Sequence, residues 1–289
     1  MAKQAENGQV VLQNGELRVV IALRGAEMIS VTDKNGKERL WNGDPAFWTS
    51  HAPVLFPYAG GLKDEYFTWQ GKRYDNPIKH GFAKVTEFTL EESSGDEAVF
   101  LLNTPVPSYP FDYEFRVAYR LKKNTIEVTY DTKNVGKGEM YFGVGCHEAY
   151  ATPGSIEAYR IVFEKEEEFL SNQLVGSQIS HETKKMAPTG KVLPLCDEQF
   201  AVDAMVFLNI RSRAVLLQND RGEDLVKVEF PGFDHMLVWK KPKAQYVCLE
   251  PWVNPPEWVD GGHDITQKPG IVKLESGEEK AYTHTISFL

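Results

Sequence analysis

The sequence has no long, predominantly apolar and uncharged run, and this limits the classes of protein that it can encode. No such run reaches the roughly 20 residues needed to span a bilayer, and the opening MAKQAENGQVVLQNGELRV has no apolar core of signal-peptide length. We therefore expect a cytoplasmic protein with no membrane partner.

An excess of positive charge is also missing. The chain has 32 basic and 41 acidic residues, which gives a net charge of -9. This balance argues against nucleic acid as a partner, because binding to a polyanion depends on a general positive field. A local basic pocket for one phosphate remains open.

Cysteine is scarce: the only three are Cys146, Cys196 and Cys248. Their number is odd, they are widely separated, and each lies in apolar sequence, which does not fit a disulfide framework or a paired-cysteine zinc site. We expect buried free thiols and no metal.

Long amphipathic helical patterns are absent, whereas alternation of apolar and polar residues recurs throughout the chain. NTIEVTYDTKN alternates in this way, and the dipeptides Asn14-Gly15, Asn35-Gly36 and Gln70-Gly71 predict hairpin turns. The acidic run EKEEEFLSNQL from Glu164 is the best candidate for a short helix, with a solvated loop as the alternative. With no Ser/Gly-rich linker, we expect one all-β domain over residues 1–289, a large antiparallel β-sandwich.

Two familiar motifs can be excluded by their spacing. In GVGCHE, Glu148 stands where a dinucleotide-binding loop needs its third glycine, and no βαβ pattern surrounds it. Position 151 is alanine, so His147-Glu148 cannot begin the two-histidine helix of a zinc protease.

Four polar side chains remain in apolar strand-like sequence and need an explanation: His80, His147, Asp203 and Glu250. Burying such groups costs several kcal/mol unless partners or function compensate. Glu250 ends the apolar run YVCLEPW, where desolvation would raise its pKa toward that of a general base; an ion-paired structural glutamate is the alternative. His147 is either a structural group or a proton donor near neutral pH. His80 fits a structural hydrogen bond or a ligand contact, and Asp203 fits a turn cap or a hydroxyl ligand.

Together, and in this order, the motifs PVLFPYAGGLKDEYFTWQGKRYDNPIKHGFAK, GVGCHEAYATP, VDAMVF and VCLEPW resemble the aldose 1-epimerase (galactose mutarotase-like) family, in its bacterial LacX-like branch. The resemblance implies the supersandwich form of the β-sandwich, an open sugar cleft, no cofactor, and interconversion of the α and β anomers of a hexose or hexose phosphate. It makes Glu250 the base that takes the C1 hydroxyl proton and His147 the acid that protonates the ring oxygen. We expect the two to face each other across a sugar-sized gap.

The resemblance also implies substrate-binding residues. His80 matches the second histidine, near the ring oxygen, and Trp252 closely follows the base and offers a stacking face. Asp203 fits the family's hydroxyl-binding aspartate better than Asp234, the alternative. Related sequences usually have arginine where this chain has Gly61, so Lys63 is the nearest candidate cation.

Two other functions stay open at this point. The missing arginine would fit a sugar-binding or sensing member of the same fold that has lost catalysis. A cupin-like iron site would use His80, His147 and one carboxylate, although no His-x-His pair supports it. Whether the chain is a monomer or a homodimer is also open.

Overall fold

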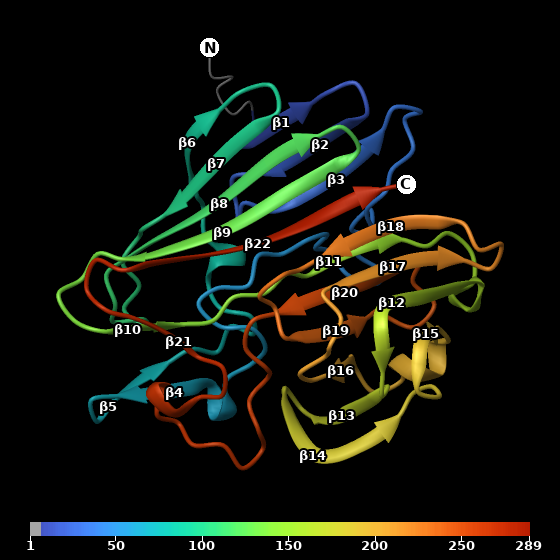
Figure 1. Ribbon diagram of the computed structural model, residues 1–289. Helices are drawn as coiled ribbons and strands as arrows, with labels where there is room; N and C mark the ends of the chain where they lie inside the picture. Colours follow the sequence, from blue (N-terminus) through green and yellow to red (C-terminus); the bar gives the residue numbers. More distant parts are fainter. Residues whose placement is uncertain (1–6) are drawn as a thin grey trace.

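A computed structural model describes residues 7–289, which form antiparallel β-sheets of very different sizes (Figure 1). The largest is nine-stranded, in the spatial order β15 (Gly190–Pro194), β12 (Tyr159–Glu167), β17 (Ala214–Asn219), β18 (Asp224–Glu229), β22 (Glu279–Phe288), β9 (Thr125–Asn134), β8 (Tyr113–Lys122), β7 (Glu97–Leu102) and β6 (Thr89–Ser93). The second is six-stranded, in the order β11 (Glu148–Ala151), β20 (Tyr246–Trp252), β19 (His235–Trp239), β16 (Met205–Phe207), β13 (Leu170–Val175) and β14 (Gln178–Lys185). The predicted all-β fold class is confirmed.

Smaller elements complete the fold. They are the three-stranded sheet β1 (Gln9–Gln13), β2 (Leu17–Ala22) and β3 (Met28–Asp33), the pairs β4 (Tyr66–Trp69) with β5 (Lys72–Asp75) and β10 (Met140–Phe142) with β21 (Val272–Leu274), and the 3₁₀ turns η1 (Lys63–Glu65), η2 (Ala83–Val85), η3 (Ile156–Ala158), η4 (Asp197–Phe200) and η5 (Ile265–Gln267). No helix within residues 7–289 has the length and apolar character to cross a membrane.

Local sequence accounts for many of these strands. Along β9, buried residues alternate with half-buried ones, as the apolar alternation predicts. Gln70 and Gly71 both have positive φ, 50° and 75°, and connect β4 to β5 in a two-residue hairpin. Asn14-Gly15 likewise lies between the paired strands β1 and β2. Asn35-Gly36 is a turn after β3, but beyond it the chain returns only as an isolated bridge from Glu38 to Thr32.

The run from Glu164 corrects one expectation, because it is neither a helix nor a loop. It forms the end of β12 and the start of β13, joined through Glu168 and Phe169. Phe163 and Phe169 are buried and pack against each other, with ring centroids 5.1 Å apart. Burial of these rings, which the acidic composition obscures, favours the strands.

The six- and nine-stranded sheets contact each other through apolar and polar side chains. Phe163 of β12 meets Phe207 of β16, with ring centroids 6.4 Å apart, and His284 of β22 reaches Glu148 of β11. One face of the six-stranded sheet therefore packs into the core. All seven residues of β20 are buried, so its other face is also covered.

Candidate active site

His147 and Glu250 are brought together by the pairing of two adjacent strands, β11 and β20. The antiparallel register pairs Glu148 with Leu249, and Cys146 N–H donates to the carbonyl of Pro251 at 3.0 Å. Continuing that register places His147 directly opposite Glu250, on the same face of the sheet. His147 and Glu250, which are 103 positions apart in the sequence, thus become cross-strand neighbours.

The two side chains lie side by side, with His147 Nδ1 3.5 Å from Glu250 Oε1. The expectation that they face each other across a sugar-sized gap is therefore wrong. Neither atom has a hydrogen-bond partner among the described residues. Burial raises the pKa of Glu250 well above its ordinary value and lowers the pKa of His147 to about 3. The pair holds one proton between its two members over a wide range of pH.

His80 is held as a neutral imidazole with a defined tautomer. Its Nδ1 accepts a hydrogen bond of 3.0 Å from Gly60 N–H, so the ring proton is on Nε2. Burial, and then the charge of His147, lower the pKa of His80 well below its ordinary value. Its ring meets that of His147 edge-on, with centroids 5.3 Å apart. His80 can therefore donate a hydrogen bond to a substrate oxygen.

Aromatic rings surround the acid-base pair. Trp48 stacks on His147 with centroids 5.1 Å apart, and Trp239 meets the same imidazole edge-on at 5.6 Å. Trp252 is buried two residues after Glu250, on the same face of β20, and its indole N–H donates to the carbonyl of Cys146 at 3.2 Å. These rings fix the imidazole orientation and exclude water from part of the pair.

A cavity of about 420 Å³ opens at this pair, within the size range of small-molecule sites. Of the predicted site residues, His80, His147, Asp203, Glu250 and Trp252 all line it. The structure thus brings together five of the six side chains that the sequence singled out.

Lys63 is the exception, because it does not line the cavity. Its Nζ donates to the carbonyl of Gly261 at 3.1 Å, and Gly261 is not a lining residue either. Asp234, the alternative to Asp203, is also outside: it is half exposed and forms an ion pair of 2.5 Å with Arg213. The cavity therefore favours Asp203 over Asp234.

Gly61, where the resemblance leads us to expect an arginine, is closely packed. A Cβ at this position would lie 2.6 Å from the Cβ of Ser177, which is in the turn between β13 and β14. Ser177 itself lines the cavity. The β13–β14 turn therefore occupies the space where a longer side chain at position 61 would begin.

The sequence analysis missed several lining residues, notably Trp48, Lys79 and Lys84. Trp48 is distant in sequence from both catalytic candidates, so only the tertiary fold reveals its stacking on His147. Lys79 and Lys84 do flank His80 within KHGFAK, and this proximity was a usable signal.

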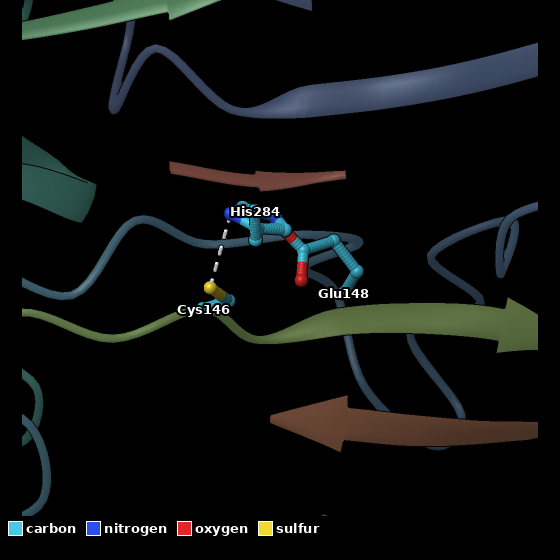
Figure 2. Close-up of side chains that lie close together, drawn as sticks. All are labelled: Cys146, Glu148 and His284. Carbon is cyan, nitrogen blue, oxygen red and sulfur yellow. Dashed lines mark hydrogen bonds and ion pairs between the residues drawn. The ribbon is translucent and has the colours of Figure 1, made fainter. Parts of the chain in front are cut away.

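A buried polar cluster lies behind the pair. Strand alternation points Cys146 and Glu148 away from His147, toward the nine-stranded sheet. Figure 2 shows His284 between them: its Nε2 is 3.0 Å from Glu148 Oε1 and its Nδ1 is 3.3 Å from Cys146 Sγ. Because the two ring nitrogens serve different partners, this arrangement is a hydrogen-bonded chain that anchors the segment carrying His147.

Two groups of side chains have ligand atoms within 4.8 Å of one another, Cys146 with Glu148 and His284, and Cys248 with His147 and Glu250. Metal binding by cysteine requires the thiolate. Burial raises the pKa of both thiols well above the ordinary value, which opposes that form. All three cysteines are free, as predicted, but Cys196 is only partly buried, contrary to expectation.

Comparison with known proteins decides the family. The model for aldose 1-epimerase matches residues 8–287. The chain belongs to the aldose 1-epimerase family. Relatives include the chromosomal protein LacX of Lactococcus lactis subsp. lactis, 27% identical over 96% of this chain and 99% of that protein.

Solved structures in this family have the same fold. A galactose mutarotase related enzyme from Lactobacillus acidophilus has a TM-score of 0.89 at 29% identity, covering 97% of each chain. A galactose mutarotase-like protein from Lactobacillus casei has a TM-score of 0.91 at 24% identity, covering 98% of this chain and all of that one. The galactose mutarotase-like β-sandwich is thereby confirmed.

Proposed function

We propose that this member of the aldose 1-epimerase family is an active mutarotase, which interconverts the α and β anomers of a hexose or hexose phosphate. The observation that carries the proposal is the contact between His147 and Glu250 on the wall of a sugar-sized cavity. A second histidine, His80, lies beside them as a neutral donor.

The reaction needs two proton transfers at oxygens bonded to the same carbon, C1. The reactive form of the pair is the one in which its single proton has moved from Glu250 to His147. Glu250 then takes the proton of the C1 hydroxyl while His147 gives its proton to the ring oxygen, and the C1–O5 bond breaks to leave an open-chain aldehyde. Rotation about C1–C2 presents the other face of the aldehyde. The O5 hydroxyl then attacks C1 and returns its proton to His147, while Glu250 returns the first proton to O1.

Glu250 and His147 lie side by side, and this suits the chemistry better than a position on opposite walls of the cavity would. The reason is that the two reacting oxygens are bonded to the same carbon. The pair begins and ends each turnover with the same single proton, so no external acid or base is consumed. His80, with its proton on Nε2, is suited to donate to the ring-oxygen region. Asp203 is suited to accept hydrogen bonds from sugar hydroxyls.

Nuclear magnetic resonance exchange spectroscopy on aldoses and their 6-phosphates tests this function. The wild-type protein is expected to accelerate anomer exchange above the uncatalysed rate, and Glu250→Gln to remove most of that acceleration. Equal exchange rates for the two proteins on every sugar would refute the proposal.

A second candidate function, sugar binding or sensing without catalysis, is favoured by one observation: Ser177 fills the space beside Gly61, where the resemblance leads us to expect an arginine that binds sugar hydroxyls. This candidate predicts saturable sugar binding that survives His147→Ala, with no anomer exchange by either protein. Calorimetry and exchange spectroscopy on the same preparation separate the two functions.

A further inference from the structure

The candidate cavity is rich in lysine, although the chain as a whole is acidic. The side chains lining it include four lysines, Lys79, Lys84, Lys240 and Lys241, but only two acids, Asp203 and Glu250. The chain carries a net charge of -9. The positive groups are therefore gathered at the cavity against the overall balance.

Two of these lysines are occupied by contacts of their own. Lys240 is almost fully buried and forms an ion pair with Asp197, a residue outside the lining. Lys241 Nζ lies 5.8 Å from the centre of the Trp239 ring. Lys240 therefore has a counter-charge of its own, and Lys241 lies over an aromatic ring.

Lys84 is different, because its charge is partly buried and unpaired. Among residues 7–289, Lys84 forms no ion pair: no carboxylate oxygen lies within 4.0 Å of its ammonium group. It lies in η2, four residues after His80. Burial, and then the charge of Lys79, lower its pKa, while the more distant carboxylate of Glu27 acts in the opposite direction.

Lys79 adds a second cation next to His80. Its closest acid is Asp203, with Nζ 3.8 Å from Oδ2, a long contact for an ion pair. Its Cγ lies 3.8 Å from the position that a Cβ on Gly61 would occupy. Lys79 therefore runs beside Gly61, through space that the absence of a side chain at position 61 leaves open.

We infer that the substrate is an anionic aldose, carrying a phosphate or a carboxylate that Lys79 and Lys84 bind. This inference rests on the proposed mutarotase function and specifies its substrate class. Bound between the two lysines, the anion would relieve their mutual repulsion and place a negative charge at ion-pair distance from Lys84, where the described residues provide none. A neutral hexose offers neither effect, so the lysines would discriminate between charged and uncharged sugars.

The test measures kcat/KM for anomer exchange of glucose, glucose 6-phosphate and glucuronate, each after subtraction of the uncatalysed rate. Wild-type protein is compared with Lys84→Met, Lys79→Met and the charge-retaining Lys84→Arg. Lys185→Met is the matched control, because Lys185 is an exposed lysine on β14 outside the cavity lining. Circular dichroism melting of each variant checks that it is folded.

We expect kcat/KM to be higher for glucose 6-phosphate, glucuronate or both than for glucose. Lys84→Met should lower the value for the preferred anionic sugar by about 10-fold or more and leave glucose nearly unchanged, since hydrogen bonds to charged groups are the stronger class. Lys84→Arg should retain most of the preference, and the control should retain all of it. Preference for phosphate over carboxylate identifies which anion the lysines bind.

Two results would overturn the inference while leaving the mutarotase function intact. One is equal kcat/KM for glucose and both anionic sugars. The other is an equal loss on charged and uncharged sugars in Lys84→Met and Lys79→Met, which would show that the lysines act on the fold rather than on the anion. Failure of the function itself is distinct, because then no sugar exchanges faster with wild-type protein than with Glu250→Gln.

Discussion

His147 Nδ1 and Glu250 Oε1 lie 3.5 Å apart on adjacent strands, and neither atom is hydrogen-bonded to another described residue. Both side chains are more than nine-tenths buried. A buried carboxyl and a buried imidazole without further partners cost stability, so such a pair points to function. Four predictions follow from it and from the groups that hold it in place.

The first prediction concerns removal of either member of the pair. Glu250→Gln and His147→Gln keep the approximate size of each side chain but cannot transfer the proton, so each should lower kcat by about 100-fold or more. Because the two groups act as a unit, the double variant should be little slower than either single variant. Exchange spectroscopy on all three proteins measures this, and multiplicative losses would contradict it.

The second prediction is a pH profile set by the single proton of the pair. The pair binds a second proton only as the pH falls toward about 3, the pKa of His147. It loses its single proton as the pH rises through the raised pKa of Glu250. We expect kcat/KM to stay high well below pH 6 and to fall on the alkaline side. Burial dominates the Glu250 pKa, and Lys79 opposes it by lowering that pKa.

Lys79→Met should therefore move the alkaline fall to higher pH. The shift should be on the order of a few tenths of a pH unit, because solvent screens the partly exposed lysine. The profile is measured from pH 4 to 9 with the uncatalysed rate subtracted. An alkaline fall that moves to lower pH in this variant would contradict the assignment to Glu250.

The third prediction concerns stability. The pKa of Glu250 is higher in the folded protein than in the unfolded chain. At pH values between these two pKa values, the folded state binds one more proton than the unfolded state. The free energy of unfolding therefore falls by about 1.4 kcal/mol for each unit that the pH rises. Glu250→Gln abolishes this loss. The free energy of unfolding of Glu250→Gln minus that of the wild type should therefore increase with pH above about 6.5, where the histidines of the unfolded chain no longer titrate.

Urea denaturation at several pH values measures that difference. If the difference stays constant with pH, Glu250 is ionised in the folded protein at every pH tested, which would contradict the prediction. No further control variant is needed, because the comparison is made between pH values for the same two proteins.

The fourth prediction concerns the chain of Cys146, His284 and Glu148 behind the pair. Glu148→Ala leaves a buried imidazole nitrogen without its partner at 3.0 Å and should cost about 1–3 kcal/mol of unfolding free energy. It should also lower kcat, because Glu148 follows His147 directly. Glu97→Ala is the matched control, since it removes an exposed ion pair with Arg120 and should cost less than about 1 kcal/mol.

A double-mutant cycle with His284→Ala then separates local from general effects. Coupling of about 0.5–3 kcal/mol between the two positions would support a chain that acts as a unit. Additive losses would contradict it, and an unchanged kcat in Glu148→Ala would show that His147 does not depend on this support.

The sequence by itself determined the strands with clear alternation and the hairpins with clear turn residues. β9 and the Gln70-Gly71 turn were predictable because the pattern is local: alternate residues face opposite sides, and two adjacent positive φ angles need residues that tolerate them. Burial of Phe163 and Phe169 depends on distant partners, so the acidic run from Glu164 was misread.

The candidate site shows the same division. The types of residue at 80, 147, 203 and 250 were visible in the sequence, since polar groups in apolar strands need a reason to be there. Only the tertiary structure placed His147 beside Glu250, through the register of β11 and β20, and excluded Lys63 from the cavity while bringing in Lys79 and Lys84. Register and packing depend on contacts between distant parts of the chain, and a single sequence does not record those contacts.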